Sequence, residues 1–392
     1  MTTTLFVTND FPPRPGGIQA FVHGLAVRRP PGSVVVYAPA WKGAAEFDAA
    51  QPFPVVRHPG TLMLPEPGVL RRAADVLRGE RCDSVVFGAA APLGLLAPAL
   101  RRRGAGRLVG ITHGHEAGWA ALPVARNLLG RIGDGVDVLT YLGEYTRSRM
   151  ARALSPAAAA RLTRLAPGVD EKLFRAGAGG SDIRSRHGLT DRPVVVCVSR
   201  LVPRKGQDAL IHAWPRVLRA IPDAALLLVG GGPYRRDLER LAVSLNVERS
   251  VVFAGGVPWE ELPAHFDAGD VFAMPCRTRR RGLDVEGLGI VYLEASATGL
   301  PVVAGDSGGA PDAVLDGETG TVVPGRSIPR IAEAVTSLLS DPQRARAMGE
   351  KGRAWIEREW RWDVQAARLG DLLAPGSGGR SDDPGRGPAP AP

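Results

Sequence analysis

The feature that most constrains the fold is an alternation of short β-branched runs with helix-compatible segments, and this alternation starts twice. It first begins at Leu5-Phe6-Val7-Thr8, passes a proline- and glycine-rich loop and continues into residues 18–27. A strand that delivers a glycine loop to a helix is the first unit of an open parallel sheet. The alternation runs to about residue 155 and restarts at residues 193–199. The sequence therefore predicts two α/β domains of the Rossmann type.

The boundary between the two domains is expected where proline and glycine interrupt the alternation. Pro167 and Gly168 precede a charged, glycine-rich stretch at residues 171–186, which we interpret as a linker. A chain of 392 residues also suits two domains on length alone. We predict a first domain over residues 1–170 and a second over residues 171–373, with its final helix returning to the first domain. Residues 374–392 are mostly Gly, Pro, Ser, Arg and Asp, which predicts a disordered tail.

Further β-branched or apolar runs predict the remaining strands. In the first domain they lie at residues 33–37, 84–87, 107–112 and 136–140, and in the second at residues 225–229, 251–253, 271–274 and 300–304. The runs of the second domain are nearly all apolar, as expected for strands covered by helices on both faces. Helices are expected over residues 330–349 and 352–373.

The net charge of +9 favours anionic partners, but charge alone does not choose among phosphates, nucleic acid and acidic lipid headgroups.

Cys82, Cys197 and Cys276 are too few and too far apart for a disulfide framework or a zinc site, which fits a reducing cytoplasm. The N-terminus lacks the pattern of a secretory signal. The longest apolar run, residues 85–100, is shorter than a bilayer span and contains two prolines. Any membrane contact is therefore expected to be peripheral.

Glycines in the first loop predict an anion-binding turn. The segment Pro12-Pro13-Arg14-Pro15-Gly16-Gly17-Ile18 lies between a strand and a helix. Glycines there leave backbone N–H groups and the helix N-terminus open to an anion. An ordinary strand-to-helix turn is an equally good interpretation of this motif alone. Because the segment lacks a GxGxxG signature, it does not support dinucleotide oxidoreductase chemistry.

Two cations follow the first strand of the second domain. Arg200 and Lys205 stand in Ser199-Arg200-Leu201-Val202-Pro203-Arg204-Lys205-Gly206. Open α/β sheets bind ligands at the carboxyl ends of their strands, and a diphosphate leaving group needs cations there. Surface pairing of basic residues is the alternative.

Two carboxylates flank a glycine-containing turn further along the second domain. Glu286 and Glu294 are eight positions apart, with Gly287, Leu288, Gly289 and Ile290 directly after the first of them. If a helix starts near Gly289, Glu294 lies on its buried side while Glu286 precedes its N-terminus. The two could then hold opposite ends of one ligand, and the N–H groups of residues 287–290 could meet hydroxyls and phosphate. Two unrelated surface glutamates are the alternative.

A histidine pair follows a strand of the first domain, in Thr112-His113-Gly114-His115-Glu116. The spacing is not that of an HExxH zinc motif, and no third ligand is near in the sequence. The pair is therefore not interpreted as a metal site.

In combination, these motifs resemble the retaining glycosyltransferases of family 4, whose B-type fold has two Rossmann-like domains facing across a cleft. The resemblance covers residues 1–372 and rests on Arg200 with Lys205, Glu286 with Glu294, the Gly16-Gly17 loop and His113. Four segments are closer still to actinobacterial members that transfer mannose from GDP-mannose to phosphatidylinositol monomannoside through an α-1,6 linkage. These are residues 9–13, residues 112–116, and residues 274–278 with 282–286.

The resemblance implies roles for the residues that would bind the donor nucleotide. Arg200 and Lys205 would hold the diphosphate. Glu294 would hold the ribose, and the backbone near Val257 would contact the base.

It also implies roles around the sugar. Glu286 and the amides of Gly287, Leu288, Gly289 and Ile290 would hold the transferred sugar and its phosphate. The Gly16-Gly17 loop would close from the first domain. His113 would touch the sugar or the departing phosphate oxygen, and Gln19 would face the acceptor.

The chemistry is expected to need no metal and no cofactor. A diphosphate leaving group needs either a divalent metal or fixed cations, and the sequence has Arg200 and Lys205 but no Asp-x-Asp motif. Retention is implied by the resemblance. The expected partners are a nucleotide-sugar donor, GDP-mannose, and a phosphatidylinositol mannoside at an anionic membrane surface, without nucleic acid. Residues 119–132 are a candidate basic amphipathic helix for that surface, and a buried core helix explains their pattern equally well.

Two other functions remain open at this point. A glycosyltransferase of the same fold could use another nucleotide sugar and a soluble acceptor. A protein with this fold could also bind a nucleotide sugar without turning it over.

Overall fold

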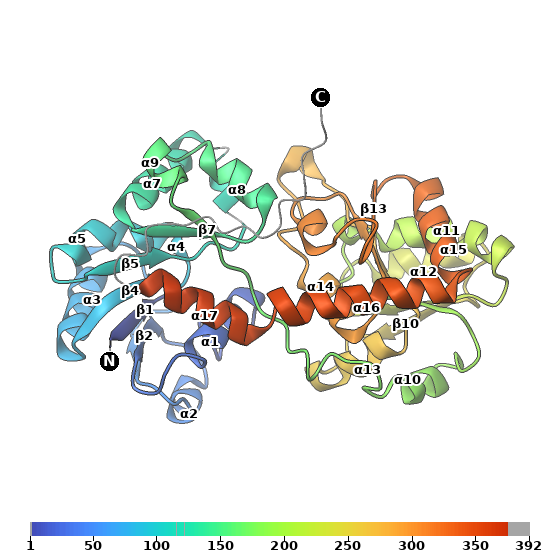
Figure 1. Ribbon diagram of the computed structural model, residues 1–392, viewed down its shortest axis with the longest axis horizontal. Coiled ribbons are helices and arrows are strands. Elements are labelled where there is room, and N and C mark those ends of the chain that lie inside the picture. The colour runs from blue at the N-terminus through green and yellow to red at the C-terminus, as the bar shows by residue number, and fades with distance from the viewer. Residues whose placement is uncertain (1, 115, 121, 375–392) are drawn as a thin grey trace. The chain divides into compact units, whose positions relative to one another are not determined.

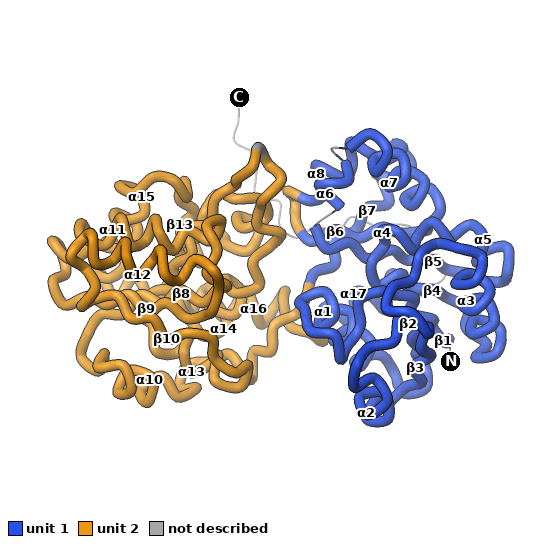
Figure 2. Tube along the Cα trace, turned by 180° about the vertical axis from the view of Figure 1, so that it is seen from behind, with its two compact units in different colours: residues 1–142, 146–166, 365–392 blue, residues 143–145, 167–364 orange. Residues whose placement is uncertain are grey.

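The computed structural model describes residues 2–114, 116–120 and 122–374 (Figure 1). They divide into two compact units (Figure 2). Unit 1 takes in the residues up to 142, residues 146–166 and the residues from 365 onward, and unit 2 takes in residues 143–145 and 167–364. The residues from Gln365 onward thus group with the N-terminal part of the chain. Residues 375–392, the predicted tail, lie outside the described residues.

Unit 1 is built on a parallel sheet with the strand order β3-β2-β1-β4-β5-β6-β7. The strands are β1 (Thr3–Val7), β2 (Val34–Pro39), β3 (Val55–His58), β4 (Cys82–Phe87), β5 (Arg107–Gly110), β6 (Val138–Tyr141) and β7 (Leu162–Arg164). β1 pairs with β2 on one side and with β4 on the other, so that Leu5 lies between Val35 and Val85. The strand order reverses at β1, and ligands of open α/β sheets bind at such a point.

Unit 2 repeats this plan with a parallel sheet of order β10-β9-β8-β11-β12-β13. The strands are β8 (Val194–Val198), β9 (Ala225–Val229), β10 (Val251–Gly255), β11 (Val271–Met274), β12 (Val302–Gly305) and β13 (Gly320–Val323). All five residues of β8 are buried, as are those of β9. The order reverses at β8, which leads into the segment with Arg200 and Lys205. The predicted pair of parallel-sheet α/β domains is therefore confirmed.

Helices connect the strands. Up to residue 186 they are α1 (Gly17–Ala26), α2 (Ala44–Ala49), α3 (Pro67–Gly79), α4 (Ala90–Leu93), α5 (Ala97–Arg101), α6 (Glu116–Trp119), α7 (Pro123–Gly135), α8 (Glu144–Ala151), α9 (Pro156–Ala159) and α10 (Gly180–Arg186), with the 3-10 turn η1 (Gly94–Leu96). Beyond it they are α11 (Gln207–Ala220), α12 (Arg235–Ser244), α13 (Leu262–Asp267), α14 (Ile290–Thr298), α15 (Ile328–Leu339), α16 (Pro342–Glu359) and α17 (Trp362–Leu373). The 3-10 turns there are η2 (Pro203–Lys205), η3 (Trp259–Glu261), η4 (Arg280–Gly282) and η5 (Ala310–Ala313).

The structure corrects the predicted helices near the C-terminus. Two were expected over residues 330–349 and 352–373, but the first region breaks after Leu339 and the second after Glu359. Pro342 opens α16 and cannot continue α15, because proline has no N–H to donate to the preceding turn. The Asp341 side chain caps α16 by accepting a hydrogen bond from the N–H of Arg344 at 3.0 Å. Capping starts a new helix where the apolar pattern alone suggested continuity.

The three cysteines are buried and unpaired in disulfides. Burial raises the pKa of Cys82 and Cys197 to about 12 and that of Cys276 to about 11. These thiols therefore stay protonated and unreactive at neutral pH.

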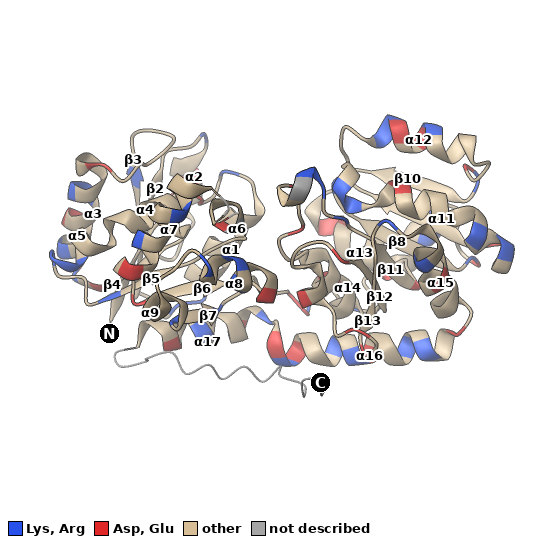
Figure 3. Ribbon diagram, turned by 90° about the horizontal axis from the view of Figure 1, so that it is seen from above, with Lys and Arg blue, Asp and Glu red and all other residues tan. Residues whose placement is uncertain are grey.

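Lysine and arginine residues are scattered over the helices of both units (Figure 3). Within the part of the chain that the structure describes, no helix has the length and apolarity needed to cross a membrane.

Candidate functional site

The Gly16-Gly17 loop leads from β1 to the N-terminus of α1, where the sequence predicted an open anion-binding turn. Gly17 is the first residue of α1 and is exposed. A Cβ added at Gly17 would meet nothing within 4 Å, whereas one at Gly16 would lie 2.1 Å from the Gln19 side-chain oxygen. The first N–H groups of a helix have no partner within that helix, so this end of α1 can receive an anion.

Gln19, expected to face the acceptor, is buried. Its Nε2 donates a hydrogen bond to Asp10 Oδ1 at 2.7 Å, and Asp10 belongs to the loop that follows β1. The amide is therefore engaged within unit 1, where it connects the glycine loop to Asp10.

His113 lies just beyond the carboxyl end of β5. Its Nε2 donates to the Gly88 carbonyl, which follows β4, at 2.6 Å, and its ring meets Phe21 edge to face at 5.6 Å. A carbonyl only accepts, so Nε2 carries a proton in this arrangement. Gly88 is closely packed, because an added Cβ would lie 2.7 Å from Thr8. The β1, β4 and β5 loops thus fix the imidazole at one edge of the sheet.

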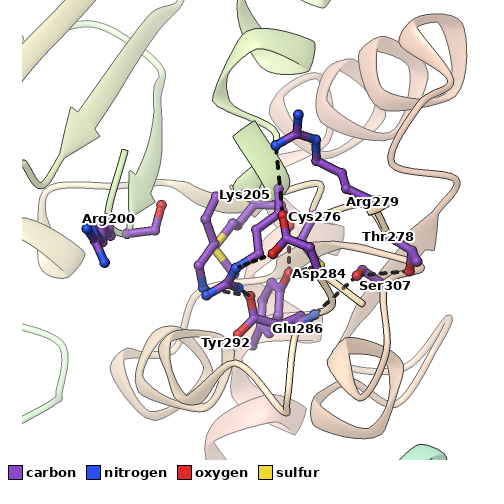
Figure 4. Close-up of polar contacts among 12 residues, drawn as sticks. Arg200, Lys205, Cys276, Thr278, Arg279, Asp284, Glu286, Tyr292 and Ser307 are labelled. Carbon is purple, nitrogen blue, oxygen red and sulfur yellow. Dashed lines mark hydrogen bonds and ion pairs between the residues drawn. The ribbon is translucent and has the colours of Figure 1, made fainter. Parts of the chain in front are cut away.

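Lys205 and Glu286 are brought together at the corresponding edge of unit 2. Lys205 closes the η2 turn after β8, and Glu286 lies in the segment between β11 and α14. Lys205 Nζ is 2.6 Å from Glu286 Oε2, and both side chains are about nine-tenths buried (Figure 4). Gly206, with a φ of 82°, lets the η2 turn pack against the segment that follows β11, since a Cβ there would lie 2.1 Å from the Pro275 carbonyl oxygen.

Arg200 does not join this cluster. Its side chain is exposed, and Figure 4 shows it apart from Lys205 and Glu286. Within the described residues it makes no ion pair. It lies at the carboxyl end of β8, five residues before Lys205, and remains available to a bound anion.

The helix predicted near Gly289 is confirmed as α14, which begins at Ile290 after Gly289 in a left-handed conformation. A Cβ on Gly289 would lie 2.6 Å from the Tyr292 ring. The N–H groups of residues 287–290 donate no hydrogen bond within the described part of the chain. The turn at Gly308 and Gly309 packs directly against this segment, and the Gly309 N–H donates to the Glu286 carbonyl at 2.9 Å. These N–H groups lie beside Glu286 at the N-terminus of α14, the kind of position at which helices bind anions.

Glu294 lies on the buried side of α14, as predicted. Burial alone raises the pKa of its carboxyl to about 8. Removing a carboxylate from water without a compensating charge favours the protonated form. A buried acid with a perturbed pKa is a candidate functional residue.

Val257 lies in the loop after β10 and is half-buried. Because the sheet is parallel, this loop opens at the same edge as the loops after β8, β9, β11 and β12. The structure therefore gathers Val257, Lys205 and Glu286 along one edge of unit 2.

Arg204 is a site residue to which the sequence interpretation gave no role. Its Nη1 donates to Glu286 Oε2 at 2.7 Å, and its Nε is 3.3 Å from Asp284 Oδ1. The sequence feature that could have pointed to Arg204 is that it stands next to Lys205, which makes two adjacent cations in the η2 turn. The sequence does not indicate which of the two side chains points to the carboxylate.

Comparison with known proteins places both units in one enzyme class. The model of the glycosyltransferase family 4 domain matches residues 15–173, and that of glycosyl transferases group 1 matches residues 181–355. The chain is 57% identical over 377 residues to the GDP-mannose-dependent alpha-(1-6)-phosphatidylinositol monomannoside mannosyltransferase of Mycolicibacterium smegmatis, covering 94% of this chain and 98% of the relative. It is 46% identical over 375 residues to the GDP-mannose-dependent monoacylated alpha-(1-6)-phosphatidylinositol monomannoside mannosyltransferase of Corynebacterium glutamicum, covering 94% of this chain and 97% of that relative.

Solved structures agree on the fold. HepE of Anabaena in complex with UDP aligns with a TM-score of 0.78 at 20% identity, covering 95% of this chain and 99% of HepE. Sucrose-phosphate synthase of Thermosynechococcus elongatus aligns with a TM-score of 0.73 at 22% identity, covering 94% and 98%.

Proposed function

The chain belongs to the family 4 and group 1 glycosyltransferases, and from this premise we propose that it transfers mannose from GDP-mannose to phosphatidylinositol monomannoside with retention, forming an α-(1,6) linkage. The observation that carries the proposal is the Lys205–Glu286 pair beside the open N–H groups of residues 287–290. This arrangement offers a cation to a diphosphate and a carboxylate to sugar hydroxyls at one sheet edge. The near full-length likeness to mannosyltransferases supports the choice of donor and acceptor.

The transfer exchanges one bond at the anomeric carbon for another. The bond from that carbon to the β-phosphate oxygen breaks as the acceptor hydroxyl attacks from the same face. Negative charge develops on the departing phosphate oxygen as this bond breaks, and the hydroxyl proton passes to that oxygen, so that GDP leaves in protonated form. Lys205, Arg200 and the α14 N-terminus would stabilise this charge, because fixed donors act most strongly where charge develops.

The donor and the turnover are tested together by assaying hydrolysis and transfer with GDP-mannose and with UDP-N-acetylglucosamine. We expect mannose transfer to phosphatidylinositol monomannoside and no reaction of the UDP sugar. Binding of GDP-mannose without cleavage would instead support the alternative that the protein binds a nucleotide sugar without turning it over. Transfer to a soluble acceptor alone would retain the enzyme class and remove the lipid acceptor.

Full activity is expected in excess EDTA. The sequence has no Asp-x-Asp motif, and Lys205 and Arg200 would supply positive charge to the diphosphate in place of a metal. Initial rates of mannose transfer would be measured with EDTA and after adding back magnesium or manganese. Loss of activity in EDTA that either metal restores would overturn this assignment of the leaving-group charge.

Residues 119–132, the candidate membrane helix, divide between the core and the surface. Leu129 and Ile132 are fully buried, which matches the core-helix interpretation. Leu122 and Val124 are 57% and 75% exposed, however, and Arg126 is exposed beside them. The start of this segment can therefore contact lipid while its end packs against the sheet.

Loops after two neighbouring strands of unit 1 expose further apolar side chains. Trp41 follows β2, and Leu62 and Leu64 follow β3. Met63 between the two leucines is fully buried, and Asn9 holds its backbone by two hydrogen bonds of 2.9 and 2.7 Å. Anchoring Met63 leaves its neighbours facing outward.

We call the five exposed side chains the apolar rim: Trp41, Leu62, Leu64, Leu122 and Val124. Trp41, Leu62 and Leu64 lie in loops directly after β2 and β3, and Leu122 and Val124 lie at the start of α7, in the connection that leaves the carboxyl end of β5. His113 and the Gly16-Gly17 loop follow carboxyl ends of the same sheet. A cytoplasmic enzyme acting on a lipid must meet the inner face of the membrane, and an apolar rim on a chain of net charge +9 suits an anionic bilayer.

The protein is expected to sediment with vesicles containing phosphatidylinositol at low salt and to dissociate as salt rises, because screening shortens the reach of surface charge to ~8 Å near physiological ionic strength. Leu62→Ser with Leu64→Ser should weaken vesicle binding about tenfold or more, since two apolar side chains lose their contact with lipid. Val243→Ser, at a residue 60% exposed in unit 2, is the matched control and should bind as the wild type does. Equal binding by all three proteins would exclude the apolar rim as the membrane contact.

A further inference from the structure

Two cations share one oxygen of Glu286. Arg204 Nη1 lies 2.7 Å and Lys205 Nζ 2.6 Å from Oε2. Within the described part of the chain, Oε1 accepts no hydrogen bond from protein. The carboxylate is thus held through one oxygen and keeps the other for a ligand.

The two cations differ in what else holds them. Arg204 has a second carboxylate partner, Asp284, with Nε 3.3 Å from Oδ1. Asp284 is fixed in turn by Arg279, whose N–H donates to the Asp284 carbonyl at 2.9 Å and whose Nη1 is 3.8 Å from Oδ2 (Figure 4). The Arg204 carbonyl also accepts the Arg277 N–H at 2.8 Å. Arg204 is therefore held in place without Glu286.

Lys205 has no such second partner, since Glu286 is its only ion-pair partner among the described residues. Its ammonium sits on a flexible stem and can turn from Glu286 to an arriving diphosphate. If Arg204 were absent, that movement would leave a buried carboxylate without a cation, which is strongly unfavourable. Arg204 removes this conflict between binding the phosphate and keeping Glu286 charged.

We propose that Arg204, held by Asp284, is a positioning residue that keeps Glu286 ionised and oriented while Lys205 moves to the diphosphate. The inference rests on the proposed function, in which Lys205 binds the diphosphate and Glu286 the sugar. Arg204 acts through Glu286 and does not itself bind phosphate. Loss of Arg204 should therefore weaken binding of the mannose moiety of the donor and slow the transfer step. It should leave the Kd of GDP almost unchanged.

The test compares Arg204→Met and Arg204→Lys with Arg277→Met as the matched control. Arg277 follows β11, in the segment that leads to Glu286, and pairs with Asp208 at 2.6 Å, and among the described residues its side chain makes no ion pair or hydrogen bond with Glu286. Calorimetry would give the Kd of GDP and of GDP-mannose, and initial rates would give kcat and KM. For Arg204→Met we expect kcat to fall on the order of tenfold to a hundredfold, the loss typical of one hydrogen bond to a charged group, with the Kd of GDP unchanged within about twofold.

Arg204→Lys should recover part of kcat, because an ammonium can still reach one oxygen, and Arg277→Met should keep the kcat of the wild type. In a Glu286→Gln background, adding Arg204→Met should cost less than about twofold, since the two residues act as one unit. A parallel rise in the Kd of GDP would make Arg204 a diphosphate ligand. Equal losses of kcat in Arg204→Met and Arg277→Met would mean that Arg204 only stabilises the local structure. Additive losses of kcat when Arg204→Met is combined with Glu286→Gln would mean the same. If the wild type itself transfers no mannose, the proposed function fails, independently of the role of Arg204.

Discussion

Lys205→Ala is expected to lower kcat/KM about a hundredfold while changing stability little. Lys205 would lose a charge-assisted contact to the diphosphate that strengthens as the leaving group develops charge, worth on the order of 3 kcal/mol. In the unliganded protein the same substitution leaves Glu286 paired with Arg204 at 2.7 Å, so no buried charge is abandoned. We expect a stability loss of about 1 kcal/mol, or about 2–4 °C in Tm for a unit of this size.

Transfer kinetics and thermal unfolding of the same preparations would measure both effects. Lys351→Ala is the control, because Lys351 is an exposed lysine on α16 and forms no ion pair among the described residues. It should match the wild type in both assays. If Lys205→Ala lost stability and turnover in equal measure, Lys205 would be a structural residue of the η2 turn.

The sequence predicted the central strands of both sheets but missed three edge strands. β3, β7 and β13 lie at the ends of their sheets, and their residues are mostly only half-buried. An edge strand mixes polar with apolar residues, as Arg57 and His58 do in β3, so it lacks the continuous apolar run that marks a central strand. These strands form because a neighbouring strand offers hydrogen-bonding groups, which is information from tertiary structure.

For the candidate site, the sequence predicted which types of residue form it and at which edge of the sheet they lie. Glycine turns after strands and the spacing of Glu286 and Glu294 indicated where the loops would meet, because parallel strands end at one edge. The pattern could not give the direction of long side chains. Arg200 remains exposed while Arg204, which was given no role, reaches Glu286, and Gln19 turns to Asp10 instead of remaining open. Such choices depend on packing and on pairs formed across the fold.

Glu294 is expected to make the unliganded protein less stable as pH rises from about 5 to about 8. In the folded state its carboxyl keeps its proton up to a pKa of about 8, whereas the ordinary value is 4.5. Between these values unfolding releases a proton, so a rise in pH favours the unfolded state. The difference of about 3.5 corresponds to a loss of up to about 5 kcal/mol, complete above pH 8.

Glu294→Gln isolates this effect, because the amide has nearly the same shape and does not titrate. Urea unfolding of both proteins from pH 5 to pH 9 should show the variant gaining stability over the wild type until about pH 8, with a constant difference above it.

If Glu294 receives the ribose hydroxyls as proposed, GDP should favour the carboxylate, since hydroxyl donors bind its charged form more strongly. Binding at pH 7 should then release nearly one proton from the wild type and none from Glu294→Gln, as measured by calorimetry in buffers of different ionisation enthalpy. Binding without proton release from either protein would place the ribose away from Glu294, and parallel pH profiles of stability would mean that Glu294 is ionised in the folded state at neutral pH.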